Sequence, residues 1–138
     1  MIKRFLCGSI VFLLLSVSAF ALEFPAHFVI PPIVEVPDLE YAGLYFPSGD
    51  RVEVRNLINE AVLVHEIGHS VMWDVQFPVC DSFVSRYART SVDEDKAESF
   101  MIFYFSREHF RRMARVDKCL MLKYKAVYRV FYPRNITK

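Results

Sequence analysis

The stretch Val62–Trp73 contains the pattern His-Glu-x-x-His, with His65, Glu66 and His69 set among mostly apolar neighbours. Its composition, together with a suitable N-cap at Asn56, predicts an α-helix. Residues four positions apart lie on one face of a helix, about one turn from each other. His65 and His69 can therefore offer two imidazoles to one metal ion.

The surroundings of this pattern favour a metal site over a purely structural role. Two histidines and a glutamate buried among apolar side chains would cost several kcal/mol without partners, and a shared metal ion supplies one. Glu66 lies one position further around the helix, where it is too short to bind the metal but can hold a water bound to it. Two neutral nitrogens beside a general base are what a zinc hydrolase requires at this spacing, so we predict one Zn²⁺ per chain.

A catalytic zinc site keeps one of its four positions for water, so a third protein ligand must come from another part of the chain. Neither His27 nor His109 has a motif around it. A later acidic segment is a better source, because Glu94 and Glu98 are four residues apart and share a helical face. One of them would bind the metal, and the other would form a hydrogen bond to a side chain that binds the metal. The neighbouring alternatives are Asp93 and Asp95.

The beginning of the chain has the parts of a secretory signal peptide. A short basic start precedes an apolar segment at residues 5–17, and the Ala-Phe-Ala at 19–21 supplies the small residues that a signal peptidase recognises. We therefore expect cleavage after Ala21, a single mature domain of residues 22–138 without a membrane anchor, and a secreted or periplasmic location. The alternative is an uncleaved anchor, since residues 5–22 are mostly apolar.

The charge of the mature chain limits the classes of partner it can bind, and its cysteine content bears on whether it forms a disulfide. Loss of Lys3 and Arg4 with the signal peptide takes the formal net charge from +1 to −1, which argues against nucleic acid as a partner. Cys7 leaves with the same segment. Cys80 and Cys119 remain as an even pair in an oxidising compartment, which is consistent with a disulfide between them or with two buried thiols.

The residues between the signal peptide and the His-Glu-x-x-His helix indicate a small sheet. Prolines exclude a helix from residues 22–38, where two short apolar pieces, 27–30 and 33–36, fit edge strands. The turn sequence Pro-Ser-Gly-Asp then separates segments 42–46 and 51–55 and predicts a β-hairpin. In the second segment valines alternate with charged residues, which is the period of a half-buried strand.

Three helices are expected in the rest of the chain. The first runs from about Leu57 to Trp73. The second begins at Ser91, which precedes Glu94 by three positions as in a capping box. The third runs from about Asp117 to Phe131. Aromatic and aliphatic residues recur at helical spacing in the last two, which predicts core packing. The fold class is therefore α+β, with a small sheet packed on the helix that carries His-Glu-x-x-His.

Three segments together resemble the catalytic domain of the anthrax lethal factor family, a group of gluzincins that also includes the secreted Pro-Pro endopeptidases. They are His65–His69, Arg86–Thr90 with the sequence Arg-Tyr-Ala-Arg-Thr, and Glu94–Phe100 with the sequence Glu-Asp-Lys-Ala-Glu-Ser-Phe. The resemblance covers roughly His65 to Phe105 and implies a minimal zincin-like domain. It does not extend to a substrate, because the mature chain has no room for delivery or recognition domains.

The resemblance also implies roles for single residues. In the family, the glutamate that opens a Glu-x-x-Ala-Glu-x-Phe segment is the third zinc ligand, and this position is Glu94 here. A tyrosine seven residues earlier donates to the developing oxyanion, and this position is Tyr87. The second acid of the segment, Glu98, would support a zinc-binding histidine. Only 24 residues separate His69 from Glu94, fewer than expected for the toxin.

These features predict a zinc-dependent peptidase, most simply an endopeptidase, with Glu66 as general base. We expect an extended peptide or protein substrate to add as a further strand along segment 51–55. Two other hypotheses are a zinc-stabilised binding module without turnover and a hydrolase of a non-protein amide such as a cell-wall peptide. Glu66 and Tyr87 argue against the binding module, since neither is needed to hold zinc.

Overall fold

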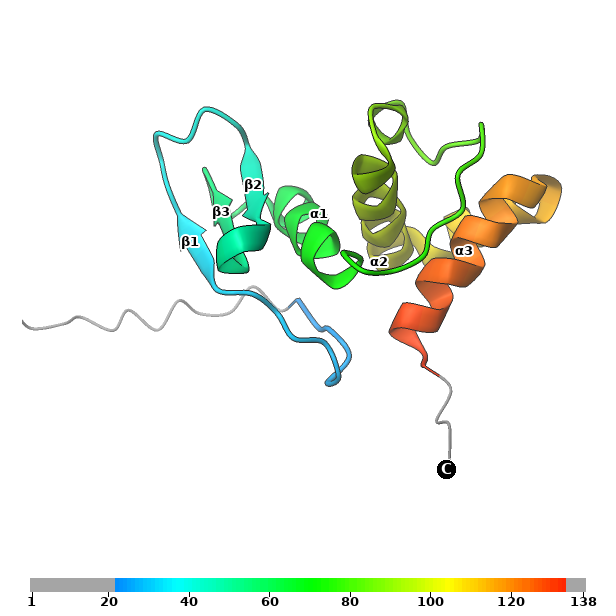
Figure 1. Ribbon diagram of the computed structural model, residues 1–138, viewed down its shortest axis with the longest axis horizontal. Helices are drawn as coiled ribbons and strands as arrows, with labels where there is room; N and C mark the ends of the chain where they lie inside the picture. The colour runs from blue at the N-terminus through cyan, green and yellow to red at the C-terminus, as the bar shows by residue number, and fades with distance from the viewer. Residues whose placement is uncertain (1–21, 134–138) are drawn as a thin grey trace, which may run out of the picture.

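Residues 22–133 are described by a computed structural model, and the predicted signal peptide and its cleavage site lie outside the described residues. Within this part of the chain no helix is both long enough and apolar enough to cross a membrane. The fold consists of a three-stranded sheet and three α-helices, in the α+β class that the sequence predicts (Figure 1).

The three short strands form one mixed sheet: β1 (Ile33–Glu35), β2 (Gly43–Phe46) and β3 (Arg51–Val54). β3 is the middle strand, parallel to β1 and antiparallel to β2. β2 and β3 form the predicted hairpin, whose turn contains the 3₁₀ segment η1 (Pro47–Gly49) and ends at Asp50 in a left-handed backbone conformation, with φ of 40°. Val52 and Val54 are fully buried, as the alternation predicted.

The expectation that segment 51–55 offers an open sheet edge is wrong. Val52 of β3 is paired with Ile33 on one side and with Tyr45 on the other, so both edges of this strand are occupied. The alternating pattern specified which face of the strand is buried, but it carries no information about the neighbours on its two edges. Among the described strands, β1 and β2 are the edge strands, and β2 is the one that packs against α1.

Residues 27–30 are not a strand either, because this segment forms a turn and an irregular stretch. Its aromatic side chain serves the core instead. The ring of Phe28 packs against the rings of Phe100 and Phe131, with centroids 5.9 and 5.1 Å away. Phe28 and Ile30 are partly buried against the core, whereas Val29 is 80% exposed, so the apolar residues of this segment reflect packing of single side chains and not a strand.

Helix α1 (Glu60–Val71) begins about three residues later than expected. Asn59 is its N-cap, because the side-chain oxygen accepts a hydrogen bond from the backbone N–H of Val62 at 3.2 Å. Asn56, the expected cap, accepts from the backbone N–H of Ile58 at 2.8 Å and closes a turn ahead of the helix. Asparagine suits both positions, so local sequence did not distinguish them.

The other two helices begin where the sequence predicted: α2 spans Val92–Val116 and α3 spans Lys118–Phe131. Ser91 caps α2 by accepting a hydrogen bond from the backbone N–H of Glu94 at 3.1 Å. Asp117 caps α3 in the same way, accepting from the backbone N–H of Leu120 at 3.0 Å. α2 is interrupted at Ser106, where φ is −144°.

The helices are layered on the sheet, with α1 between the sheet and α2, and α3 packed against α2 (Figure 1). Phe100 of α2 is fully buried and stacks near Phe131 of α3, with centroids 5.0 Å apart. Gly68 allows α1 and α2 to approach closely, because a Cβ at this position would lie 3.2 Å from the Cα of Ala97. This close approach brings the acidic start of α2 next to the histidines of α1.

A long connection leads from α1 to α2. It contains the short 3₁₀ segment η2 (Tyr87–Arg89), and the structure joins Cys80 of this connection to Cys119 of α3 by a disulfide, with Cα atoms 6.1 Å apart. The connection passes alongside α3 before it returns to the start of α2 (Figure 1). Tyr87 is thereby brought back to the face of α1 that carries the two histidines.

Candidate metal centre

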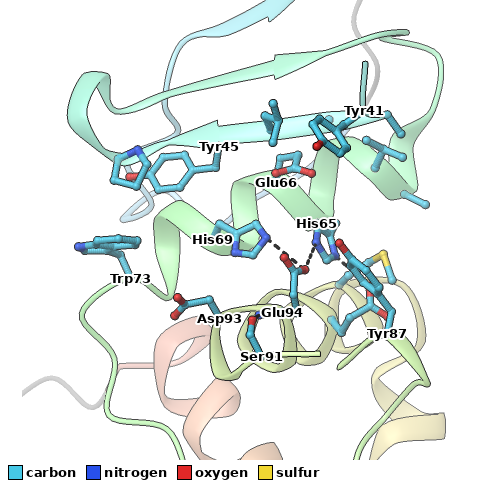
Figure 2. A pocket seen from close by; sticks show the side chains of 18 residues that line it. Tyr41, Tyr45, His65, Glu66, His69, Trp73, Tyr87, Ser91, Asp93 and Glu94 are labelled. Atoms are coloured by element: carbon cyan, nitrogen blue, oxygen red, sulfur yellow. Dashed lines mark hydrogen bonds and ion pairs between the residues drawn. The ribbon is translucent and has the colours of Figure 1, made fainter. Parts of the chain in front are cut away.

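α1 presents His65 and His69 on the face that looks toward the start of α2 (Figure 2). Their ring centroids are 4.9 Å apart, which follows from the one-turn spacing along the helix. His65 is only 8% exposed, and His69 is partly buried. The Nε2 atoms of both rings lie close to one carboxylate on α2.

That carboxylate belongs to Glu94, in the first turn of α2. Its Oε2 is 2.9 Å from His65 Nε2 and 3.4 Å from His69 Nε2. The three candidate ligand atoms all lie within 4.8 Å of one another, and no other group of three such side chains comes together in residues 22–133. A tetrahedral zinc ion with bonds of 2.0–2.1 Å holds its ligand atoms about 3.3 Å apart, so the donor set and its spacing fit zinc.

Glu98 lies one turn further along α2, behind His65. Its Oε1 is 2.8 Å from His65 Nδ1. This hydrogen bond lowers the pKa of Glu98, so the carboxylate is ionised and acts only as an acceptor. Each ring nitrogen of His65 lies within hydrogen-bond distance of a carboxylate, Nδ1 of Glu98 and Nε2 of Glu94. When Nδ1 donates to Glu98, the neutral tautomer leaves Nε2 for a metal ion. A carboxylate that fixes a histidine in this tautomer is a common support for a metal ligand.

The two histidines differ in their electrostatics. Burial opposes ionisation of His65, but the hydrogen bond to Glu98 and the charges of Glu66 and Glu94 outweigh it and raise the pKa of the ring. For His69 burial dominates and lowers the pKa, although the charge of Glu94 opposes it. Nε2 of His69 and Oε2 of Glu94 face each other 3.4 Å apart, and a histidine whose pKa is lowered offers a neutral nitrogen to a cation.

The alternative ligands predicted from the sequence are not part of this group of three. Asp93 lines the same cleft, but its side chain is mostly exposed. Asp95 is turned to the other side of α2, where its Oδ2 lies 2.6 Å from Nζ of Lys123. His27 contacts a backbone carbonyl of α3 through Nε2 at 2.9 Å, and His109 is exposed.

Glu66 lies beside the histidines, between α1 and the edge strand β2 (Figure 2). It is 7% exposed, and burial raises its pKa to about 7, a rise that His65 reduces and the charge of Glu94 increases. Gly43 of β2 makes room for it, because a Cβ there would lie 2.7 Å from Glu66 Cγ and 2.9 Å from Oε1. A carboxylate that titrates near neutral pH is well suited to exchange protons.

Tyr87 lies on the other side of His65, with ring centroids 5.7 Å apart. Its side chain remains accessible, with 54% of the residue exposed. Burial and the negative charge of Glu94 raise the pKa of its hydroxyl, so this group stays protonated and can donate a hydrogen bond. The 3₁₀ segment η2 holds it in place, since Thr90 Oγ1 donates to the carbonyl of Tyr87 at 2.8 Å.

These groups line one open cleft of about 660 Å³ between β2 and the start of α2 (Figure 2). β2 forms one wall, and Tyr45 and Trp73 stand at one end with ring centroids 6.1 Å apart. Neither these two aromatic residues nor Gly43 is among the site residues that the sequence predicts. The sequence places Trp73 four positions after His69, but α1 ends at Val71, so Trp73 reaches the cleft from the turn that follows the helix. No local signal marks Tyr45, which depends on the order of strands in the sheet.

Comparison with protein-family models, with curated proteins and with solved structures finds no match for this chain.

Proposed function

We propose that this chain is an exported zinc-dependent peptidase that binds one Zn²⁺ through His65, His69 and Glu94. The observation that carries the proposal is the convergence of these three ligand atoms beside the buried carboxylate of Glu66 in one open cleft. Each residue has the chemistry that its role needs. The two histidines and Glu94 supply two imidazole nitrogens and one carboxylate as ligands, and the pKa of Glu66 lies near neutral pH.

When bound, Zn²⁺ would lower the pKa of a coordinated water and polarise the substrate carbonyl. Glu66 accepts a proton from the attacking water and passes it to the leaving amine, and its pKa of about 7 suits both transfers. Tyr87 donates its hydroxyl proton in a hydrogen bond to the carbonyl oxygen as negative charge develops there. Glu98 holds His65 in the correct tautomer through the 2.8 Å contact at Nδ1.

An extended peptide binds along β2 rather than along the central strand. The carbonyl of Ala42 accepts a hydrogen bond from the backbone N–H of Arg55. In an antiparallel pair every second residue bonds to the partner strand, so the residues two and four positions after Ala42 also bond to β3. Gly43 and Tyr45 are the residues between, and their backbone groups are directed to the outer edge, beside Glu66. A substrate strand on this edge passes in front of the metal ligands. The Tyr45–Trp73 pair then provides an aromatic surface for a large side chain at one end of the cleft.

The proposed class is that of the anthrax lethal factor family and the Pro-Pro endopeptidases, with a zincin-like fold. Its support is the arrangement around His65, where Glu94, Glu98 and Tyr87 occupy the sides that their implied roles require. Export follows from the proposed signal peptide. The two alternatives, a zinc-held binding module and a hydrolase of a non-protein amide, remain outcomes of the activity test.

Metal content tests the ligand set. The protein beginning at residue 22 should purify with one zinc, and His65→Ala and Glu94→Ala should lose it, as measured by mass spectrometry of the metal. His109→Ala and Glu108→Ala are matched controls, because both residues are exposed on α2, and they should retain zinc. Full zinc content in Glu94→Ala would contradict the assignment of this residue as the third ligand.

Cleavage of a random peptide library tests the reaction. The parent protein should hydrolyse a subset of peptides, and Glu66→Gln should keep its zinc but lose about a hundred- to ten-thousand-fold in rate. A zinc-loaded parent that binds peptides without cleaving them would favour the binding module. Cleavage confined to cell-wall peptides would favour the non-protein amide.

A further inference from the structure

Lys123, in the middle of α3, is a lysine with no exposed surface. Lysine is almost never fully buried unless its charge is paired. Here Nζ lies 2.6 Å from Asp95 Oδ2, 2.6 Å from the carbonyl oxygen of Ser82 and 3.4 Å from the carbonyl oxygen of Cys80. An ammonium group has three N–H donors, so these three acceptors satisfy it completely. It also lies over the ring of Phe83, 4.3 Å from the centroid.

The acceptors belong to two segments that both reach the candidate metal centre. Asp95 directly follows Glu94, the candidate third ligand, in the first turn of α2. Ser82 lies in the connection that leads to Tyr87. One buried ammonium group on α3 therefore holds the start of the ligand helix and the segment that carries the oxyanion donor.

The connection depends on such attachments, because residues 72–86 contain no helix or strand. Its contacts with α3 are the disulfide from Cys80 to Cys119, the hydrogen bond from Ser82 Oγ to Asp117 Oδ2 at 2.6 Å, and the two carbonyl contacts of Lys123. Cys119 and Lys123 are four residues apart and so share one face of α3. The ammonium group is the one attachment among these that also reaches α2.

A purely structural ion pair would not need this arrangement. Replacing a buried ion pair by apolar side chains is often neutral or stabilising, so stability alone gives little reason to keep Lys123 and Asp95. The geometry of the site gives a stronger reason to keep this pair. Removing a group that supports a metal ligand typically weakens metal binding by tenfold to a hundredfold.

We propose that Lys123 is a positioning residue, which sets Glu94 and Tyr87 at the correct distance from each other through Asp95 and the Ser82 carbonyl. The inference rests on the proposed function, since it concerns the same zinc centre. It predicts that the Lys123–Asp95 pair affects zinc affinity and the order of the connection independently of its effect on folding.

The test compares Lys123→Met, Asp95→Asn and the double variant. Lys123→Met keeps an unbranched side chain but leaves the charge of Asp95 unpaired, and Asp95→Asn in the double variant removes that charge, so the double variant is the one designed to fold. Phe110→Leu is the matched control, because Phe110 is buried against Tyr124 of α3 and is not among the residues that line the cleft.

Zinc dissociation constants are measured by chelator competition, and amide hydrogen exchange is followed in residues 82–90. The double variant should bind zinc at least tenfold more weakly and exchange faster at 82–90, whereas Phe110→Leu should match the parent in both. Parent-like zinc affinity and exchange in the double variant would overturn the inference. A parent protein that binds no zinc would instead refute the proposed function, and the exchange measurement would still test whether Lys123 holds the connection.

Discussion

Glu66→Gln is expected to stabilise the metal-free protein, although it removes the proposed general base. Glu66 is 7% exposed, and its pKa rises from 4.5 to about 7 on folding. Because the folded state holds its proton to a higher pH than the unfolded state, the contribution of this group to stability falls as pH rises from about 4.5 to about 7. A pKa difference of about 2.5, at 1.36 kcal/mol per unit, corresponds to about 3 kcal/mol at pH 8.

The measurement is urea and thermal denaturation of parent and variant, both with zinc removed by chelator, at pH 5 and pH 8. Glutamine has no charge to desolvate, so the advantage of Glu66→Gln should be small at pH 5 and should reach about 3 kcal/mol at pH 8, or roughly 10 °C in Tm for a chain of this size. Glu108→Gln, an exposed control, should show no such change. If the difference in unfolding free energy between parent and Glu66→Gln is the same at both pH values, the conclusion that burial raises the pKa of Glu66 is wrong.

Three further results are expected. Tyr87→Phe should lower kcat by about a hundredfold or more with little change in KM in steady-state kinetics, because its hydroxyl acts once charge has developed, and parent-like kcat would remove Tyr87 from the reaction. Gly43→Ala should keep zinc but lower kcat, because the new Cβ would lie 2.7 Å from Glu66 Cγ and displace this side chain. Unchanged kinetics would show that β2 moves to make room without displacing Glu66. Reduction of Cys80–Cys119 should cost about 4 kcal/mol for a separation of 39 residues, so an unchanged denaturation midpoint would contradict the disulfide.

Local patterns predicted the elements whose causes lie within a few residues of sequence. Ser91 caps α2 as expected, and α3 begins at the expected place, with Asp117 accepting from the backbone N–H three positions later. The one-turn spacing of His65 and His69 is a property of the helix itself. The alternation in β3 predicted the burial of its valines. Each of these depends on a periodicity or a capping contact that sequence displays directly.

Predictions failed where two local signals were equivalent or where a partner strand decided the outcome. Asn56 and Asn59 are both good caps, and the packed position of α1 selected Asn59. β3 is not an edge strand, because β1 pairs with it on one side and β2 on the other, and the outer edges belong to β1 and β2. Strand neighbours arise from long-range pairing, which an alternating pattern does not encode.

By itself, the sequence determined the chemistry that this protein can offer: two imidazoles on one helical face, a carboxylate beside them, and a capped acidic turn with Glu94 and Glu98 four residues apart. The tertiary structure alone decided how these groups meet. Gly68 lets α2 approach α1 closely enough for Glu94 to reach both histidines, and Lys123 joins α2 to the connection that carries Tyr87. The reason is physical, since a side chain's type and helical face are local properties, whereas distances between separate elements are set by the packing of the whole chain.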